Sequence, residues 1–273
     1  MIAWFRHLDL LLRGESTRLP LLRSGGLRVP AGGLSFVAAL LGALYGVCMG
    51  VFALTAGGSR QHMQMVASTL KVPALFLLTL LVTFPSLYVF SALMGSRLTV
   101  NATLRVLVAA LAVMLAVLSS LGPIVAFFSF TTTSYPFMVL LNVVVFAVSG
   151  MLGLAFLLQT LRRLAVVAAI DEQPESTSEA PPPVDEAGLP PIPPPVPYPP
   201  GAGPLDRSGR YPPTPQVSVV FRIWIVVFGL VGAQMSWILR PFIGHPNLPF
   251  QWFRSPGSNF FEGVMHAIKR LAE

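Results

Sequence analysis

The chain has 273 residues, of which 54% are hydrophobic and only 11% are charged, whereas soluble domains average about 25% charged residues. No Asp or Glu occurs between Glu15 and Asp171, and a soluble domain of that length would need charges of both signs on its surface. The formal net charge is +7, but the basic residues stand singly beside apolar runs, which is typical of headgroup anchors rather than of a nucleic-acid-binding surface. The sequence therefore predicts an all-α integral membrane protein that binds no nucleic acid.

Residues 1–32 are expected to form a basic cytoplasmic tail. Ile2, Phe5, Leu8 and Leu12 recur at helical spacing, and Trp4 and Leu11 flank that face. An amphipathic helix of this kind lies in the plane of the membrane surface with its apolar face in the lipid. The sequence therefore predicts a short surface helix before the first membrane span.

Four apolar runs follow and define a membrane domain over residues 33–163. A bilayer core of about 30 Å needs about 20 helical residues, and each run supplies that number. The predicted spans cover residues 33–54, 72–94, 106–128 and 137–161. Loops over residues 55–69 and 95–105 and a neutral turn at residues 131–136 are expected to connect them.

Prolines interrupt two of these spans. Pro73 suits the first turn of the second span, whereas Pro85 and the Gly122-Pro123 pair lie inside spans and should kink them. Such breaks free backbone carbonyls that can line a transport path. No Asp, Glu, Lys or Arg lies mid-span beside them, and Asn142 is the only amide well inside the first four spans. Static kinks are the favoured interpretation, and a transport path is the alternative.

Residues 164–216 are predicted to be a tether without a packed core. Sixteen prolines lie between Asp171 and Gln216, and six acidic residues are crowded between Asp171 and Glu186. Proline runs favour polyproline II, so the segment is expected to be a disordered or semi-rigid connector. At about 3.1 Å per residue it could reach on the order of 100 Å. A fifth span is expected over residues 217–239, with the stem of Arg222 reaching to the interface.

The distribution of Lys and Arg predicts the orientation. Five arginines precede the first span, the next two connections carry two basic residues each, the third carries none, and four follow the fourth span. Because positive loops stay cytoplasmic, we expect a cell (inner) membrane protein whose N-terminus and tether are cytoplasmic. The tail over residues 240–273 would then lie outside, although it holds four basic residues of its own.

Three glycines in the first span predict close helix packing. Gly42, Gly46 and Gly50 repeat every four residues and share one face. Without side chains, two helix backbones can approach closely in a membrane. The partner is either another span of the same chain, which is the favoured interpretation, or a second copy in a homo-oligomer. Gly229 and Ala233 form a weaker version of the same pattern.

The end of the fifth span and the tail hold the least generic residues of the chain. The candidate interaction residues are Gln234, Trp237, Arg240, Pro241, Phe242, Trp252 and Phe253. An interfacial belt, in which Trp lies at headgroup depth and Arg binds phosphates, explains the Trp and Arg residues. It explains less well the prolines and the glutamine within the span. A folded aromatic cap on the bundle, or a partner-binding surface, is therefore the alternative.

A last helix is expected from Asn259 to Ala272. Asn259 is a candidate N-cap with Glu262 three residues later, which is the pattern of a capping box. Phe261, Val264, Ile268 and Leu271 share one face, opposite Lys269 and Arg270. The helix is expected to lie on the membrane surface or on the bundle.

Catalytic, cofactor and metal sites are not indicated. The four histidines, His7, His62, His245 and His266, are scattered, and Cys48 is the only cysteine. No metalloprotease, P-loop, nucleophile-elbow or dinucleotide-binding motif occurs. Acid–base chemistry at the membrane would need a titratable pair near one site, and the spans contain none. The sequence favours a protein that is not an enzyme.

Two blocks of the sequence resemble an uncharacterised family of bacterial multi-pass membrane proteins. They are KVPALFLLTLLVTFP at residues 71–85 and QMSWILRPFIG at residues 234–244, and the similarity covers most of the chain except the tether. The resemblance implies the same span–tether–span layout and no reaction. Some relatives carry an actin-binding WH2 designation, which would need a Leu-Lys-Lys-Thr-like motif, whereas this chain has only LRRL at residues 161–164. The first four spans also resemble, more distantly, the Yip1-type membrane fold.

These observations favour a non-enzymatic membrane scaffold or adaptor. Its partners would be the bilayer and a soluble protein that docks on the polyproline or acidic stretches of the tether, and a tether that is only a spacer is the alternative to docking. A component of a transporter or permease that uses the Pro-kinked helices is the rival function. Such a component would depend on Pro85, Pro123 and Asn142 and would tolerate loss of the tether.

Overall fold

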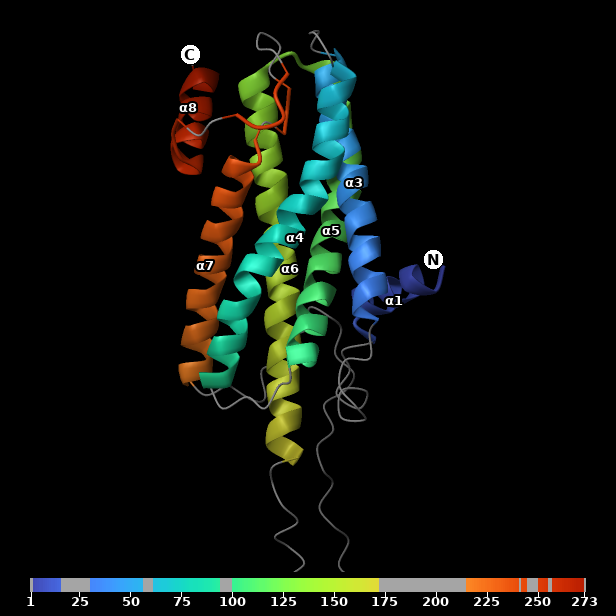
Figure 1. The fold of residues 1–273 in the computed structure, drawn as a ribbon, viewed down its shortest axis with the longest axis vertical. Helices are drawn as coiled ribbons and strands as arrows, with labels where there is room; N and C mark the ends of the chain where they lie inside the picture. Colours follow the sequence, from blue (N-terminus) through green and yellow to red (C-terminus); the bar gives the residue numbers. More distant parts are fainter. Residues whose placement is uncertain are drawn as a thin grey trace, which may run out of the picture.

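The computed structural model describes residues 2–15, 30–55, 61–93, 100–171, 215–240, 242–244, 250–254 and 257–272. All regular structure in these ranges is helical, which confirms the all-α prediction for the described part of the chain. The helices are α1 (Ile2–Leu12), α3 (Ala31–Thr55), α4 (Gln61–Leu93), α5 (Val100–Thr131), α6 (Tyr135–Asp171), α7 (Pro215–Ile238) and α8 (Phe260–Ala272) (Figure 1).

Four of these helices are long and apolar enough to cross a membrane, which confirms the predicted long apolar helices. The stretches concerned are Ala31–Thr55, His62–Val89, Val100–Thr131 and Tyr135–Leu164. In α7 the corresponding apolar stretch is shorter, Trp224–Ile238. At 1.5 Å per residue, each of the four long stretches exceeds the thickness of about 30 Å that a hydrocarbon core requires.

The long helices alternate in direction (Figure 1). Helix α3 begins at the end of the bundle near α1, α4 returns, α5 ascends beside α3, and α6 descends again, so the end of α6 and the start of α7 lie at the same end as the N-terminal segment. Helix α7 then runs beside α4 towards the opposite end, where α8 packs along α6. The two ends of the bundle therefore carry different parts of the chain.

Helix α5 forms the centre of the bundle. Every residue from Val106 to Leu115 is buried, because α5 is packed between α3 and α6 and also touches α4 and α1. A helix that is apolar on all sides belongs in such a position. The other long helices expose leucine, valine and phenylalanine outward, as a lipid-facing surface requires.

The predicted start of the second span was wrong. Helix α4 begins at Gln61 rather than near residue 72, so Pro73 lies well inside the helix instead of in its first turn. The preceding residues are helical because Gln64 and Ser68 are buried against a distant segment of the chain. Pro73 packs against Gly42 of α3. A Cβ added at Gly42 would lie 3.2 Å from Pro73 Cα, so the glycine leaves room for the proline.

Two other helices are also longer than the predicted spans. Helix α5 begins at Val100 instead of residue 106, and α6 begins at Tyr135 and continues to Asp171, beyond the predicted end at residue 161. Helix α6 extends seven residues past its apolar stretch, which ends at Leu164, whereas the apolar stretch of α5 covers the whole helix. Pro85 and Pro123 lie inside helices, as predicted.

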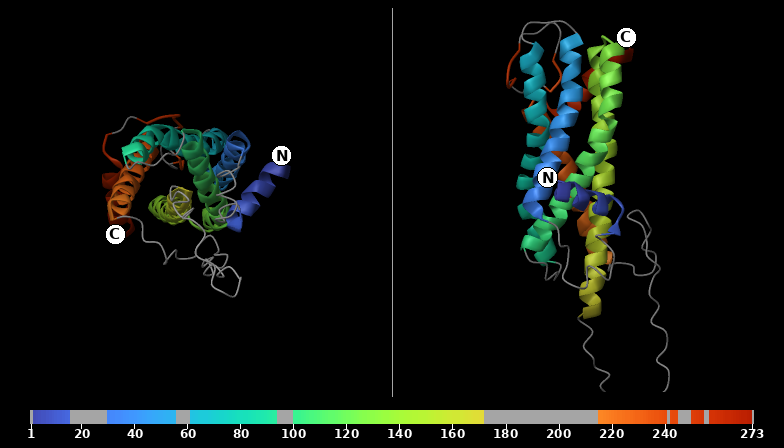
Figure 2. Two further views of the ribbon diagram at one scale, coloured as in Figure 1. Left: turned by 90° about the horizontal axis from the view of Figure 1, so that it is seen from below. Right: turned by 90° about the vertical axis from the view of Figure 1, so that its right-hand side faces the viewer.

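Helix α1 lies crosswise to the bundle axis, beside the start of α3 (Figures 1 and 2). Its contact with the bundle differs from the predicted face, because Leu8 and Leu11 are buried whereas Phe5 and Leu12 are exposed. Trp4 packs edge-to-face on Phe36 with ring centroids 5.8 Å apart, and its indole covers Gly33, where an added Cβ would lie 2.7 Å from the ring. Part of the apolar surface of α1 therefore anchors it to the bundle.

Candidate functional site

Polar side chains on α4 hold the C-terminal part of the chain. The Gln64 amide donates a hydrogen bond of 3.0 Å to the Phe242 carbonyl, and the Ser68 hydroxyl donates to the same oxygen. The Lys71 ammonium donates to the Trp252 carbonyl. Residues 64, 68 and 71 follow helical spacing, and all three side chains are buried. One face of α4 is thus a receptor for residues 242–244 and 250–254. We call these residues, together with Arg240 and with α8, which packs on α6, the C-terminal cap.

Two cations at the C-terminal cap each lie over an aromatic ring. The Lys71 ammonium lies 5.0 Å from the centroid of Phe253, and the Arg240 guanidinium lies 3.9 Å from that of Trp237. The backbone N–H of Arg254 donates a hydrogen bond of 3.3 Å to the backbone carbonyl of Arg240, which holds the two residues next to each other. Burial, and then the positive charge of Arg254, lower the pKa of Arg240. Cation–π contacts of this kind gain strength where water is excluded.

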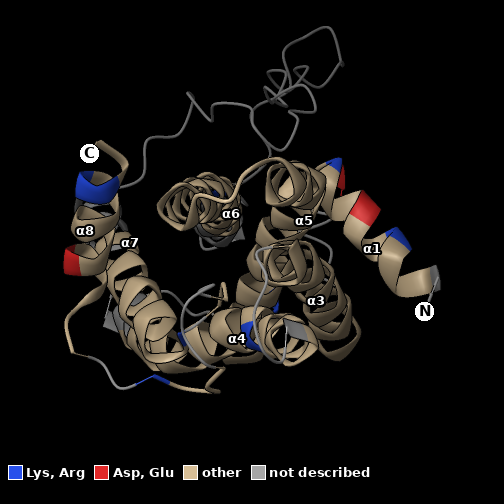
Figure 3. Cartoon of the chain, turned by 90° about the horizontal axis from the view of Figure 1, so that it is seen from above, with Lys and Arg blue, Asp and Glu red and all other residues tan. Residues whose placement is uncertain are grey.

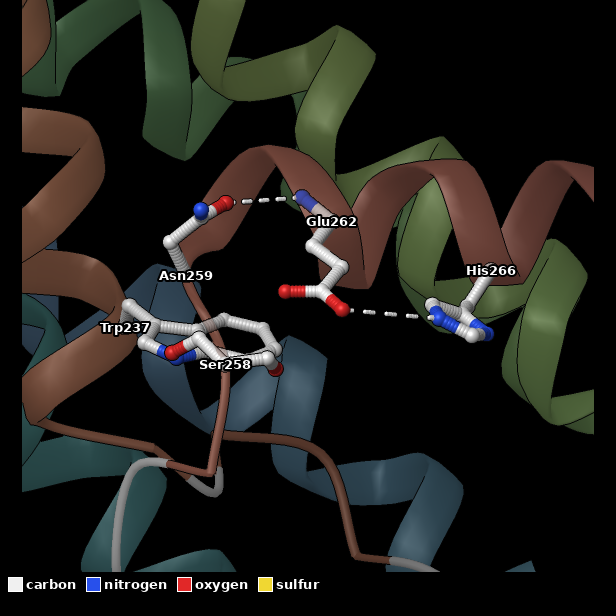
Figure 4. Close-up of polar contacts among 5 residues, drawn as sticks. All are labelled: Trp237, Ser258, Asn259, Glu262 and His266. Atoms are coloured by element: carbon white, nitrogen blue, oxygen red, sulfur yellow. Dashed lines mark hydrogen bonds and ion pairs between the residues drawn. The ribbon is translucent and has the colours of Figure 1, made fainter.

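Helix α8 is fixed at its N-terminus (Figure 4). The Asn259 side chain accepts a hydrogen bond of 2.9 Å from the Glu262 amide, as the predicted N-cap requires. The Glu262 carboxylate points to His266, at 4.0 Å, instead of back to the backbone. The Trp237 indole donates to the Ser258 carbonyl, and its ring lies directly against Gly263, which leaves no room there for a side chain. Helix α8 therefore lies on the bundle, one of its two predicted positions.

The predicted interaction residues fall into three groups. Trp237 at the end of α7 and Arg240 are half-buried and Phe242 is buried, so the three line the inner side of the C-terminal cap. Trp252 and Phe253 are 45% and 62% exposed and form its outer surface. Gln234 is exposed on α7 below the cap. Pro241 lies outside the described residues.

Gln64, Ser68 and Lys71 were not among the predicted site residues, because the sequence analysis placed the first two in a loop. Their spacing along a single helical face was the signal that could have identified them. Three polar residues at this spacing on a membrane helix indicate a buried polar partner, which here is the backbone of the C-terminal cap.

The glycine face of α3 is occupied by α4. An added Cβ would lie 3.2 Å from Pro73 Cα at Gly42, and 2.9 Å from Met65 Cα at Gly50. At Gly46 it would lie 2.6 Å from the Ser68 carbonyl oxygen. The distances at Gly46 and Gly50 are shorter than real Cβ contacts, and the one at Gly42 is tight. The three glycines therefore allow the backbones of α3 and α4 to pack closely within one chain.

The polar groups near the helix breaks bond to one another. The Tyr45 hydroxyl donates a hydrogen bond of 2.7 Å to Asn142 Oδ1, and Asn142 Nδ2 donates to the Met138 carbonyl at 2.8 Å. Beside Pro85, the Ser86 hydroxyl accepts a hydrogen bond of 3.2 Å from the Trp224 indole. These contacts connect α3 to α6 and α4 to α7, which is a packing role.

The described residues contain no group of three or more His, Cys, Asp or Glu side chains placed to hold a metal ion. His7, His62 and His266 lie on three different helices, and His245 is outside the described ranges. Comparison of the chain with protein-family models, curated proteins and solved structures found no match. The family resemblance of the two sequence blocks thus stays a hypothesis, and the function is argued from the molecule itself.

Proposed function

We propose that this chain is a non-enzymatic scaffold or adaptor of the cell (inner) membrane, with five spans and a cytoplasmic Pro-rich tether that docks a soluble protein. The observation that carries the proposal is the position of the tether's two ends. Helix α6 continues to Asp171, seven residues past the end of its apolar stretch at Leu164, and α7 begins at Pro215 at the same end of the bundle (Figure 1). The two helix ends that flank residues 172–214 thus lie at the same end of the bundle.

Helix α7 supports the fifth crossing. Its 24 residues correspond to about 36 Å at 1.5 Å per residue, and it packs beside α4. Trp224 near its start is fully buried and donates to Ser86 of α4. A fifth crossing places the C-terminal cap and the tether on opposite faces of the membrane.

The charge pattern supports a cytoplasmic tether. Helix α3 begins at the end of the bundle where α6 ends and α7 begins, and five arginines precede α3 in the sequence. Arg105 and Arg162 lie on helices that reach the same end. Positively charged segments of this kind remain on the cytoplasmic side. The tether itself offers polyproline runs and an acidic stretch, which are two established modes of peptide recognition.

The interior contacts favour this function over a transporter component. Asn142 and the polar groups beside the proline breaks are hydrogen-bonded between helices, and the centre of the bundle is the fully buried stretch of α5. A transport path needs polar groups along its length that are available to bind the solute one after another. Here those groups hold helices together.

Affinity capture from native membranes tests the proposal. The intact chain is compared with a variant in which residues 173–213 are replaced by a Gly/Ser segment of equal length, which leaves α6 and α7 unchanged. We expect a soluble protein that is recovered with the intact chain, lost with the Gly/Ser variant, and displaced by a synthetic peptide of residues 173–213. Equal recovery of every soluble protein by the two variants would show that the tether is a spacer.

A further inference from the structure

Three arginines from separate segments of the chain meet at the end of the bundle that carries the C-terminal cap. Arg240 follows α7, Arg254 ends the segment 250–254, and Arg270 lies in the last turn of α8. All three guanidinium groups lie close enough to Tyr135, the first residue of α6, for their charges to act on its hydroxyl. The fold therefore gathers three positive charges around the start of α6.

Backbone and ring contacts position two of these arginines. The backbone N–H of Arg254 donates to the Arg240 carbonyl at 3.3 Å, and the Arg240 guanidinium lies 3.9 Å from the centroid of Trp237. Stacking on a ring uses the face of a guanidinium, whereas its N–H donors lie in its plane. After burial, the charge of Arg254 is what lowers the pKa of Arg240, so the two charges repel each other. An anion bound between them would offset this repulsion.

This part of the chain carries more basic than acidic residues. Residues 240–273 contain four Lys or Arg and two Glu. Glu262 lies in the first turn of α8, where its carboxylate faces His266, and Arg270 is about 12 Å further along the helix at 1.5 Å per residue. Viewed onto the cap end of the bundle, the acidic and basic segments of α8 lie at opposite ends of the helix (Figure 3). Glu273 lies outside the described residues. The charge at the arginines thus favours an anionic ligand.

The arginines lie at the level of the lipid headgroups. The apolar stretch of α6 begins at Tyr135, and that of α7 ends at Ile238, just before Arg240. Arginines at the ends of membrane helices mark the headgroup level. Apolar side chains adjoin them in the sequence, because Phe253 is 62% exposed and Leu271 is 48% exposed. A ligand that suits both kinds of group combines a phosphate with hydrocarbon chains.

We propose that Arg240, Arg254 and Arg270 bind the phosphate of an anionic phospholipid from the leaflet at the cap end of the bundle. Their guanidinium groups donate charge-assisted hydrogen bonds to the phosphate oxygens, and the exposed rings and aliphatic side chains next to them contact the acyl chains. Phosphatidylglycerol suits the site better than phosphatidylcholine, because the choline group brings a positive charge that the arginines repel. The bound lipid joins α6 to the cap, whichever side of the membrane is cytoplasmic.

Native mass spectrometry of the intact chain in detergent micelles tests the proposal. The chain is titrated with phosphatidylglycerol, with phosphatidylcholine of the same acyl chains, and with inorganic phosphate. The test variant is R254Q/R270Q. The matched control is R162Q/K269Q, which removes the same number of charges from exposed positions, one at the opposite end of the bundle and one beside Arg270.

We expect the unchanged chain and the control to bind phosphatidylglycerol more tightly than phosphatidylcholine. The affinity of R254Q/R270Q for phosphatidylglycerol should be lower by about tenfold or more, because two charge-assisted hydrogen bonds are lost. Inorganic phosphate at the same concentration should not displace phosphatidylglycerol, because it makes no contact with the apolar side chains beside the arginines.

Three results would overturn the proposal. Equal affinity of the unchanged chain for the two phospholipids would mean that the headgroup charge is not recognised. Equal affinity of R254Q/R270Q and the control for phosphatidylglycerol would mean that the lipid binds elsewhere. Displacement by inorganic phosphate would assign the arginines to a soluble anion instead of a lipid. The first comparison needs no substitution, so a folding defect of a variant cannot hide the answer.

Discussion

Lys71 on α4 donates a hydrogen bond to the backbone carbonyl of Trp252, which lies 181 residues later in the chain. The contact joins the second long helix to the C-terminal cap, and three helices (α5, α6 and α7) lie between the two partners in the sequence. A buried lysine inside a long apolar helix needs such an acceptor, because an unpaired ammonium would be costly there. Lys71 is therefore an anchor of the cap on α4.

Replacement of Lys71 by methionine should release the C-terminal cap. The substitution removes the hydrogen bond to Trp252 and the contact with Phe253, and hydrogen bonds from charged groups contribute about 1.5–3 kcal/mol. We expect faster proteolytic cleavage within residues 245–256 in detergent micelles. Mass spectrometry of the fragments locates the cleavage sites and measures their rate of appearance. Lys269→Met on the exposed side of α8 is the control. Identical cleavage of the Lys71 variant and the unchanged protein would contradict the anchoring role.

Gly46→Ala should destabilise the bundle. Its new Cβ would lie 2.6 Å from the Ser68 carbonyl and 2.7 Å from Thr69 Cα, and backbone atoms cannot move aside as a side chain can. Overpacking of this kind costs about 1–3 kcal/mol. Thermal unfolding in detergent measures the effect. Gly229→Ala is the matched control, because nothing lies within 4 Å of its added Cβ, and there alanine should be neutral or stabilising.

Tyr45→Phe should leave a buried amide oxygen without its donor. Asn142 Oδ1 accepts from the Tyr45 hydroxyl in the interior, and loss of one partner of a buried pair costs about 1–3 kcal/mol. The double variant with Asn142→Leu removes both polar groups and should be less destabilised than the sum of the single variants. Additive losses of unfolding free energy would show that the two side chains do not interact.

The extent to which the sequence predicts the fold differs between parts of the chain. The apolar runs located the four long helices, because the bilayer demands a minimum length of apolar residues. The true start of α4 was not predictable in this way, since Gln64 and Ser68 become favourable in a helix only once Phe242 is folded onto them. That contact joins residues far apart in sequence, which local patterns do not report.

The candidate site was predicted in composition but not in arrangement. The aromatic and basic residues of the tail were identified as unusual, and the bundle-packed position of α8 was one of two alternatives. The receptor residues on α4 were missed, because an expected loop concealed their helical spacing. The partner of Gly42, Gly46 and Gly50 was likewise left open, since a glycine pattern shows that a helix is approached closely but not by which neighbour.

The central claim is that the tether and the C-terminal cap lie on opposite faces of the membrane, with the tether in the cytoplasm. Cys48 is the only cysteine, so Cys48→Ala supplies a cysteine-free background for Ser208→Cys in the tether and Gln251→Cys in the cap. A membrane-impermeant maleimide applied to intact cells should label Gln251→Cys at once and Ser208→Cys only after permeabilisation. Labelling of both positions from the same side would contradict the five-span arrangement and the docking function built on it.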